Sequence, residues 1–347
     1  METDKIIITN LPAFYKINLF NRISNHEKIF VIFTGNTAEI RNNDFFKQNL
    51  IKFNFIDLKN KSSVYCFFFM VKLFMSAKYN QLIIGGWDEP LLWMASVLSK
   101  KKKNSVIVES SIYESKIHGI KSIVKKLFLK RISKAYASGN SQVRLLQALK
   151  FKGLIIKTKG VGIFNIHPQP YFEERNKVIN FLYVGRLSKE KNLEKLIKVF
   201  KELPELVLHI IGFGPDEEYL KSIASENIKF HGAVKNTELH KFYKLYDVFI
   251  LPSIAEPWGL VVEEALNNGM PVIISNKVGC GDEIVIDGNN GLIFKVEDEN
   301  DMKVAVIKIR NLHLYNHLRR NVSEMNFEET AKRQIEVYLE KNNKTNS

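Results

Sequence analysis

The chain has 347 residues and a mass of 40.1 kDa, and its 45% apolar and 25% charged residues exclude a mainly disordered protein. Its two cysteines, Cys66 and Cys280, cannot form a disulfide framework, and its longest apolar run, 64–71, is far shorter than the about 20 residues that span a membrane. With a net charge of +14 and a start that does not resemble a secretory signal, we expect a soluble, cytoplasmic protein with an anionic partner.

The first half of the chain alternates short apolar strands with helical stretches, which is typical of a parallel sheet covered by helices. We predict strands at Lys5–Thr9, Ile29–Phe33, Gln81–Gly85, Ser105–Val108 and Leu154–Lys157. Helices are predicted at Lys16–Ser24, Pro90–Leu98 and Ile120–Ile132.

This half also carries the basic charge of the chain. Residues 1–165 hold 27 basic and 10 acidic residues, a net charge of +17, whereas the remainder holds 24 and 27, a net charge of −3. Such asymmetry indicates that the first half meets a membrane face, a lipid phosphate or a nucleic acid. The alternative is that a lysine-rich composition only solvates the surface.

The second half repeats the alternation of strands and helices. Strands are predicted at Ile179–Val184, Leu206–Ile211, Ile228–Phe230, Val248–Leu251, Pro271–Ser275 and Leu292–Phe294. Helices are predicted at Lys189–Glu202, Asp216–Ala224, Thr237–Tyr246, Gly259–Asn268 and Asp298–Leu314.

These elements predict an α/β protein of two doubly wound, Rossmann-like domains that face each other across a cleft. The basic N-terminal domain is expected at 1–165, followed by a proline-containing linker at 166–176 and a second domain at 177–326. A C-terminal helix in 327–347 is expected to pack back on the N-terminal domain. Because open α/β sheets bind ligands at the carboxyl ends of their strands, we expect the site there.

The segment 251–269 follows a strong strand and opens a helix, for which Pro257 is a suitable start. The first backbone N–H groups of a helix lack partners within it, and the helix dipole adds positive potential. Gly259, Leu260 and Val261 therefore form a candidate phosphate site, at which Gly259 allows close approach. The alternative is an ordinary surface helix with acidic residues in its first turn.

Two carboxylates flank this segment, Glu256 and Glu264. Eight helical residues cover about 12 Å, which is too far for both to hold one metal ion. They suit opposite ends of an extended ligand with hydroxyl groups at each end. Spacing alone does not decide between Glu264 and its neighbour Glu263.

Two cations follow the strand at 179–184. Gly185 makes a turn after it, and Arg186 and Lys191 come next. Basic side chains at a helix start oppose the helix dipole, so their position favours a role in neutralising a diphosphate. By contrast, Gly212–Gly214 lacks the third glycine of a dinucleotide fingerprint and is interpreted as a tight turn.

Taken in order, these segments resemble the retaining group 1 glycosyltransferases of the GT-B fold. The resemblance runs from about residue 180 to 295 and rests on segments of characteristic sequence: Val184–Leu187, Lys191–Leu193, Ile211–Pro215, Phe230–Gly232, Leu251–Ser253, Glu256–Glu264, Gly269–Ser275 and Asp287–Leu292. It implies a nucleotide-sugar donor, with a UDP-sugar favoured, bound mainly by the C-terminal domain.

Residue by residue, the resemblance implies that Arg186 and Lys191 hold the diphosphate and that Glu256 binds the hydroxyls of the donor sugar. Glu264 would bind the ribose, and the backbone of 259–261 the phosphates. The base would be lined by Phe230, Gly232 and Val234, with Gly185 also at the donor.

The first half resembles the family more loosely. Residues 10–20, with Lys16, are similar to the N-terminal loop of members that act on bacterial surface polysaccharides, and Trp87 and Glu109 lie in similar segments. These three residues and His118 are the candidate acceptor-side residues. The glycine-rich first loop of many relatives is absent, and Glu109 stands where some relatives have a histidine.

No D-x-D, H-E-x-x-H or zinc-spaced cysteine pair occurs, so neither a metal nor a cofactor is expected. The segment 116–134 predicts a helix with Ile117, Ile120, Val124, Leu127 and Phe128 on one face and lysines largely off it. Periodicity does not decide between an interfacial membrane helix and a core-packing helix with a basic outer face. Lys100–Lys103 lie close in sequence and are expected to add to attraction for anionic lipid.

We therefore expect a metal-independent, retaining hexosyltransferase that moves a hexose or N-acetylhexosamine to a lipid-linked saccharide of O-antigen, lipopolysaccharide or capsule synthesis. It would lie on the inner face of the plasma membrane. A nucleic-acid-binding protein and a non-transferase GT-B enzyme, such as a sugar-nucleotide epimerase, are the alternatives.

Overall fold

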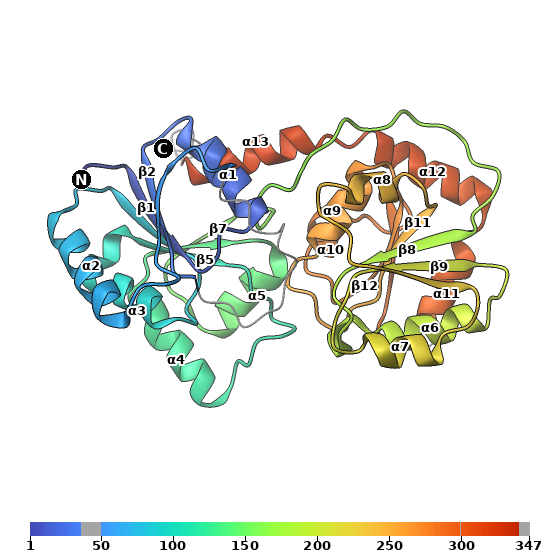
Figure 1. Ribbon diagram of the computed structural model, residues 1–347, viewed down its shortest axis with the longest axis horizontal. Helices are drawn as coiled ribbons and strands as arrows, with labels where there is room; N and C mark the ends of the chain where they lie inside the picture. Colours follow the sequence, from blue (N-terminus) through green and yellow to red (C-terminus); the bar gives the residue numbers. More distant parts are fainter. Residues whose placement is uncertain (36–49, 299, 340–347) are drawn as a thin grey trace. The chain divides into compact units, whose positions relative to one another are not determined.

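The computed structural model describes residues 1–35, 50–298 and 300–339, which fall into two compact units (Figure 1). The first comprises residues 1–163 with the C-terminal segment from residue 330, and the second comprises 164–329. The segment 166–176, predicted to be a linker, groups with the second unit because its polar groups bond there: the His167 amide donates to Asn267 Oδ1 at 2.8 Å.

The N-terminal unit is built on a seven-stranded parallel sheet in the order β3-β2-β1-β4-β5-β6-β7. Its elements are, in chain order, β1 (Lys5–Thr9), α1 (Phe14–Ser24), β2 (Ile29–Phe33), β3 (Asn54–Asp57), α2 (Ser63–Ser76), β4 (Gln81–Ile84), α3 (Pro90–Leu98), β5 (Asn104–Val108), α4 (Gly119–Leu129), β6 (Lys134–Ala137), α5 (Asn140–Ala148) and β7 (Leu154–Lys157). Strand β1 is buried along its whole length, as expected for a parallel strand covered on both faces.

Helices cover both faces of this sheet. Buried side chains from α2, α3, α4 and α5 share one core cluster with the residues of one sheet face, such as Ile8, Ile84 and Val106. On the other face, Tyr136 of β6 packs against Tyr338 of α13 (Phe327–Tyr338), with ring centroids 4.7 Å apart. Helical segments therefore pack on both faces of the sheet, as in a doubly wound fold.

The C-terminal unit has a six-stranded parallel sheet in the order β10-β9-β8-β11-β12-β13. Its elements are β8 (Asn180–Val184), α6 (Leu193–Lys201), β9 (Val207–Ile211), α7 (Glu217–Ile223), β10 (Ile228–Gly232), α8 (Leu239–Tyr243), β11 (Val248–Leu251), α9 (Leu260–Asn267), β12 (Val272–Ser275), α10 (Gly281–Ile284), β13 (Gly291–Phe294), α11 (Asp301–Lys308) and α12 (Leu312–Ser323). The predicted fold class, two Rossmann-like α/β domains, is confirmed.

Six elements are absent from the sequence prediction: β3, α2, β6, α5, α10 and α12. Helix α2 carries apolar residues almost all round and so lacks a helical periodicity, and β6 has four residues. The predicted helix Asp298–Leu314 is too long: α11 ends at Lys308, and Asn311 caps the start of α12 by accepting a hydrogen bond from the Leu314 amide.

Two helix starts also differ from the prediction. Helix α6 begins at Leu193, because Lys189–Lys191 form a 3₁₀ turn and Asn192 has a left-handed backbone (φ 59°). Helix α9 begins at Leu260, three residues after Pro257, because Gly259 has φ 97°. Arg186 and Lys191 therefore lie in the loop before α6, and Gly259 lies in the turn before α9.

None of the helices within the described ranges is long and apolar enough to cross a membrane.

Candidate active site

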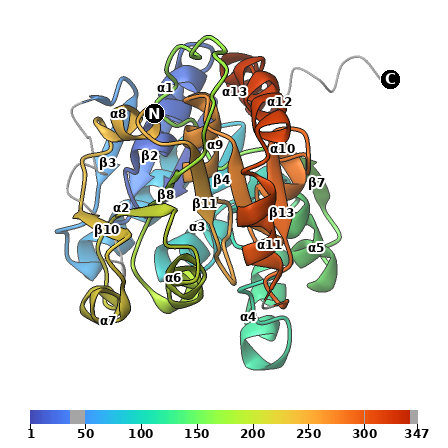
Figure 2. The ribbon, with the colours of Figure 1, turned by 90° about the vertical axis from the view of Figure 1, so that its right-hand side faces the viewer.

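Strands β8 and β11 are neighbours at the point where the order of the C-terminal sheet reverses. From β8 the chain continues to β9 on one side, and from β11 it continues to β12 on the other. Figure 2 shows the outer strands β10 and β13 on opposite sides of β8 and β11. The loops after two such strands diverge and leave a crevice at their carboxyl ends, where open α/β sheets bind ligands. Arg186 and Lys191 follow β8, and Glu256 and Gly259 follow β11.

Glycines allow the turns at this edge to pack against one another. A Cβ on Gly212 would lie 1.8 Å from the carbonyl oxygen of Gly185, and a Cβ on Gly214 would lie 2.3 Å from that of Leu187. Larger residues would force the turns after β8 and β9 apart. The interpretation of Gly212–Gly214 as a tight strand-to-helix turn is confirmed.

The carbonyl groups of the turn before α9 accept hydrogen bonds from backbone amides of the protein. The Glu256 and Trp258 oxygens accept hydrogen bonds from the Gly279 and Cys280 amides at 2.9 and 2.8 Å. The Val262 amide donates to the Gly259 oxygen at 2.9 Å. Among the described residues no hydrogen bond is donated by the amides of 259–261, so the start of α9 keeps three backbone donors for an anion.

Each of the two predicted cations forms an ion pair with a carboxylate. Lys191 Nζ lies 2.5 Å from Glu256 Oε2, and these side chains are only 15% and 13% exposed. Arg186 lies 2.7 Å from Glu190 Oε1. The structure therefore brings Lys191 and Glu256 together across the loops of β8 and β11.

Glu190 is held ionised beside Arg186. Burial raises its pKa, but hydrogen bonds from Ser188, from its own backbone and from Arg186 outweigh that effect and lower the pKa to about 2. Glu190 is a residue that the sequence prediction missed. Arg186 and Glu190 are four residues apart, but they lie in a loop with a 3₁₀ turn, so no helical pattern in the sequence indicated the pair.

The two adjacent glutamates of α9 have different surroundings. Glu263 is buried and accepts a hydrogen bond from Trp258 Nε1 at 2.7 Å, and burial raises its pKa to about 8. Glu264 stays partly exposed and accepts from the Tyr243 hydroxyl at 3.0 Å, and burial raises its pKa to about 7. Glu263 thus interacts with a buried side chain of the protein itself, Trp258.

Because α9 starts only at Leu260, the estimate that places Glu256 and Glu264 on one continuous helix is wrong. Glu256 lies in the turn before the helix, where its backbone amide donates a hydrogen bond to the Lys277 carbonyl oxygen at 3.1 Å.

The residues predicted to line the base lie on and after β10, at the end of the sheet. Phe230 is half-buried, and the Gly232 oxygen accepts from the Gly212 amide at 2.8 Å. Val234 follows two residues later and is also half-buried. This hydrogen bond joins the end of β10 to the turn after β9, and so places it at the same sheet edge as Gly185.

In the N-terminal unit, three of the four predicted acceptor-side residues follow neighbouring strands. Lys16 in α1 comes after β1, and its buried amino group lies 3.0 Å from Glu109 Oε1 and 3.2 Å from Thr9 Oγ1. Glu109 comes directly after β5. Trp87 follows β4, which lies between β1 and β5.

Trp87 packs inward rather than standing free. Its ring meets Phe128 with centroids 6.4 Å apart, and Lys125 Nζ lies 5.6 Å from its centroid. His118 is exposed and precedes α4 without making a side-chain capping bond.

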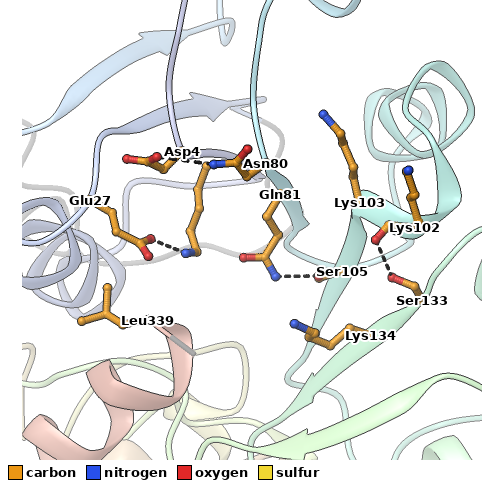
Figure 3. A pocket seen from close by; sticks show the side chains of 11 residues that line it. Asp4, Glu27, Asn80, Gln81, Lys102, Lys103, Ser105, Ser133, Lys134 and Leu339 are labelled. Atoms are coloured by element: carbon orange, nitrogen blue, oxygen red, sulfur yellow. Dashed lines mark hydrogen bonds and ion pairs between the residues drawn. The ribbon is translucent and has the colours of Figure 1, made fainter. Parts of the chain in front are cut away.

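A cavity of about 340 Å³ lies at the opposite edge of this sheet. Lys5, Gln81 and Lys134 line it from the first residues of β1, β4 and β6, so it is an amino-end pocket (Figure 3). Gln81 Nε2 donates to Ser105 Oγ there at 2.9 Å. No predicted site residue lines this cavity.

Metal ligands do not gather in the described ranges: no group of three His, Cys, Asp or Glu side chains is placed to hold an ion.

Residues 167–326 match the family model of the glycosyl transferases group 1. Among curated relatives, an uncharacterised 41.2 kDa protein of the cps region of Klebsiella pneumoniae is 34% identical over 42% of this chain and 40% of that protein. The sulfoquinovosyl transferase SQD2 of Arabidopsis thaliana is 36% identical over 44% of this chain and 30% of its own length. The O-antigen biosynthesis glycosyltransferase WbnH of Escherichia coli is 33% identical over 44% and 45%.

The chain thus spans less than half the length of these three relatives. Solved structures match it over nearly the whole chain. The apo form of the lipopolysaccharide outer core galactosyltransferase WaaB has a TM-score of 0.72 at 16% identity, covering 98% of this chain and 100% of that one. HepE of Anabaena in complex with UDP has a TM-score of 0.71 at 15% identity, covering 97% and 98%. These likenesses show the GT-B fold.

Proposed function

Because residues 167–326 match the family model of the glycosyl transferases group 1, we propose that the chain transfers a sugar from a nucleoside diphosphate sugar to a saccharide acceptor. The observation that carries the proposal is the set of unused amides at 259–261, which follow Glu256 and its ion pair with Lys191 at the switch point of the sheet. Backbone donors and cations at one helix start suit the diphosphate of such a donor.

The chemistry follows from where charge develops. As the bond between the sugar and the diphosphate breaks, negative charge grows on the departing phosphate oxygen. The amides of 259–261 and the amino group of Lys191 stabilise that charge without any rearrangement of solvent. Because these groups act more strongly on the transition state than on the ground state, they lower the barrier, and the transfer is proposed to proceed without a metal.

Glu256 contributes through Lys191. Its carboxylate holds the amino group in place before the donor arrives, and its second oxygen accepts a hydrogen bond from a sugar hydroxyl. We further propose retention of configuration, with Glu264 at the ribose and 230–234 beside the base.

A UDP-sugar carrying a hexose or N-acetylhexosamine is the proposed donor. Two structures of the same fold support this choice, the HepE complex with UDP and glucose and the GtfA complex with UDP and GlcNAc. A lipid-linked saccharide of O-antigen or capsule synthesis is the proposed acceptor, as the WbnH and cps-region relatives suggest. Such an acceptor places the enzyme at the inner face of the plasma membrane.

A thermal-shift panel tests the proposal. Uridine, adenosine and guanosine diphosphates and their sugar conjugates are added to the full chain, with the nucleosides as controls. A ligand at 100 times its dissociation constant adds about 2.7 kcal/mol of stability, so a specific donor should raise the melting temperature by several degrees. We expect uridine diphosphate compounds to stabilise the chain and uridine not to. Equal, small shifts with all nucleotides would contradict a donor site.

A further inference from the structure

The helices α2, α3 and α4 lie next to one another on one face of the N-terminal sheet (Figure 1). Their inner sides join the same core cluster, and the rings of Trp93 in α3 and Phe128 in α4 meet with centroids 5.2 Å apart. The outer sides of the three helices therefore form one continuous surface, which we name the three-helix face.

Helix α4 presents its apolar stripe outward on this face. Ile120, Ile123, Val124 and Leu127 have the spacing i, i+3, i+4, i+7, and all four are exposed, Ile120 by 81%. The buried side of the helix is formed instead by Ser122, Phe128 and Leu129. Helix α4 therefore packs in the core through Phe128 and Leu129, while the predicted apolar face at Ile120, Val124 and Leu127 stays outside it. The placement of Phe128 on the same face as Ile120 is wrong.

Helix α2 adds larger side chains to the face. Phe68 is 65% exposed and Met75 83% exposed, and Val64, Tyr65 and Phe67 are exposed with them. On α3, Val97 and Leu98 are exposed as well. A folded protein rarely leaves so many large apolar side chains together in water unless they contact a partner or a membrane.

The charge around these side chains has one sign. None of the segments 63–76, 90–98 and 119–129 contains an Asp or a Glu. Across 61–134 the chain has fourteen Lys and Arg against four Asp and Glu, a net charge of +10 out of +14 for the whole chain. On α4, Lys121 is exposed and Lys126 is half-exposed.

We propose that the three-helix face docks on an anionic lipid bilayer. The apolar side chains of α2 and α4 enter the boundary between headgroups and acyl chains, and the lysines neutralise the lipid headgroups. Aliphatic side chains such as Ile120 and Met75 give no contact to a phosphate backbone, which argues against a nucleic acid. A second copy of the chain would set two lysine-bearing faces without acidic residues on their helices against each other, which argues against a dimer.

Vesicle flotation tests the proposal with the full chain and no donor. The vesicles contain phosphatidylglycerol and phosphatidylcholine, or phosphatidylcholine alone. We expect binding only to the anionic vesicles, weakened roughly tenfold or more by Lys121→Glu with Lys126→Glu. Phe67→Glu with Phe68→Glu should weaken it to a similar degree, although it leaves the lysines in place.

Matched changes on the C-terminal unit serve as controls. Leu245→Glu replaces a residue that is 68% exposed there, and Lys195→Glu replaces an exposed lysine. Both should leave flotation unchanged, and circular dichroism should show all variants folded.

Three outcomes would overturn the proposal. They are absence of wild-type flotation, flotation that the Phe67 and Phe68 changes do not reduce, and a wild-type dimer in sedimentation that those changes dissociate. Preferred binding to RNA over anionic vesicles would replace the lipid by a nucleic acid. The inference rests on the proposed function only for the nature of the acceptor. A chain that binds anionic vesicles but no nucleotide would contradict the transfer activity and leave the membrane docking in place.

Discussion

Alanine in place of Lys191 is expected to lower kcat for sugar transfer by about 10²–10³-fold, the effect of removing one donor to a developing oxyanion. The amino group of Lys191 is only slightly exposed and is held by Glu256, so it acts at a fixed position and in a medium that screens charge weakly. Arg186→Ala should lower kcat less, because Arg186 is more exposed and salt-bridged to Glu190.

Removing Lys191 also leaves Glu256 without its partner, so loss of folding must be separated from loss of chemistry. Lys191→Arg keeps the charge and should recover part of the activity, whereas Lys191→Ala with Glu256→Gln should not. Lys195→Ala, at an exposed position on α6, is the matched control and should retain full activity. Near wild-type rates in Lys191→Ala and Arg186→Ala, measured with saturating donor, would remove both residues from the diphosphate site.

Glu263 and Glu264 should respond to alanine in opposite ways. Glu264→Ala is expected to weaken donor binding about tenfold to a hundredfold, the effect of losing one hydrogen bond to a charged group. It should lower stability less than Glu263→Ala does, because Glu264 is partly exposed, although the buried Tyr243 hydroxyl loses its acceptor. Glu263→Ala should lower the free energy of unfolding by about 2–4 kcal/mol, because the buried Trp258 Nε1 loses its acceptor and a cavity remains. Calorimetry of donor binding and chemical denaturation measure the two effects. A larger loss of donor affinity in Glu263→Ala would show that the roles are exchanged.

The raised pKa of Glu263 gives this second prediction a pH dependence. The carboxyl has a pKa of about 8 in the folded chain and about 4.5 when unfolded, so the unfolded chain ionises first as the pH rises. The stability that Glu263 contributes is complete below pH 4.5 and is lost as the pH rises to 8. The glutamine of Glu263→Gln does not titrate. The melting temperature of this variant should therefore rise relative to that of the wild type as the pH increases from 5 to 8. A constant difference over that interval would contradict a protonated Glu263.

The fold was predictable because parallel strands buried on both faces have distinctive sequences. Strands such as Lys5–Thr9 and Val248–Leu251 are short apolar runs that end in polar or turn residues, and periodicity is not needed to find them. Helix α2 was missed for the converse reason. Its outer side is as apolar as its inner side, since Phe68 and Met75 remain exposed, so no helical period marks it.

The site was predictable in its residue types but not in its pairings. Gly259 and the carboxylates near it stand out in one segment, since a strand, a turn and a helix start are local features. The contact of Lys191 with Glu256 joins residues 65 apart and depends on β8 lying beside β11, which no local pattern specifies. The choice between Glu263 and Glu264 depends on Trp258 and Tyr243, whose side-chain directions follow only from packing.

A crystal structure of the chain grown with uridine diphosphate tests the central claim most directly. We predict that phosphate oxygens lie within hydrogen-bond distance of the Gly259, Leu260 and Val261 amides and of Lys191 Nζ. A nucleotide bound elsewhere, with those three amides bonded to protein groups, would contradict the account.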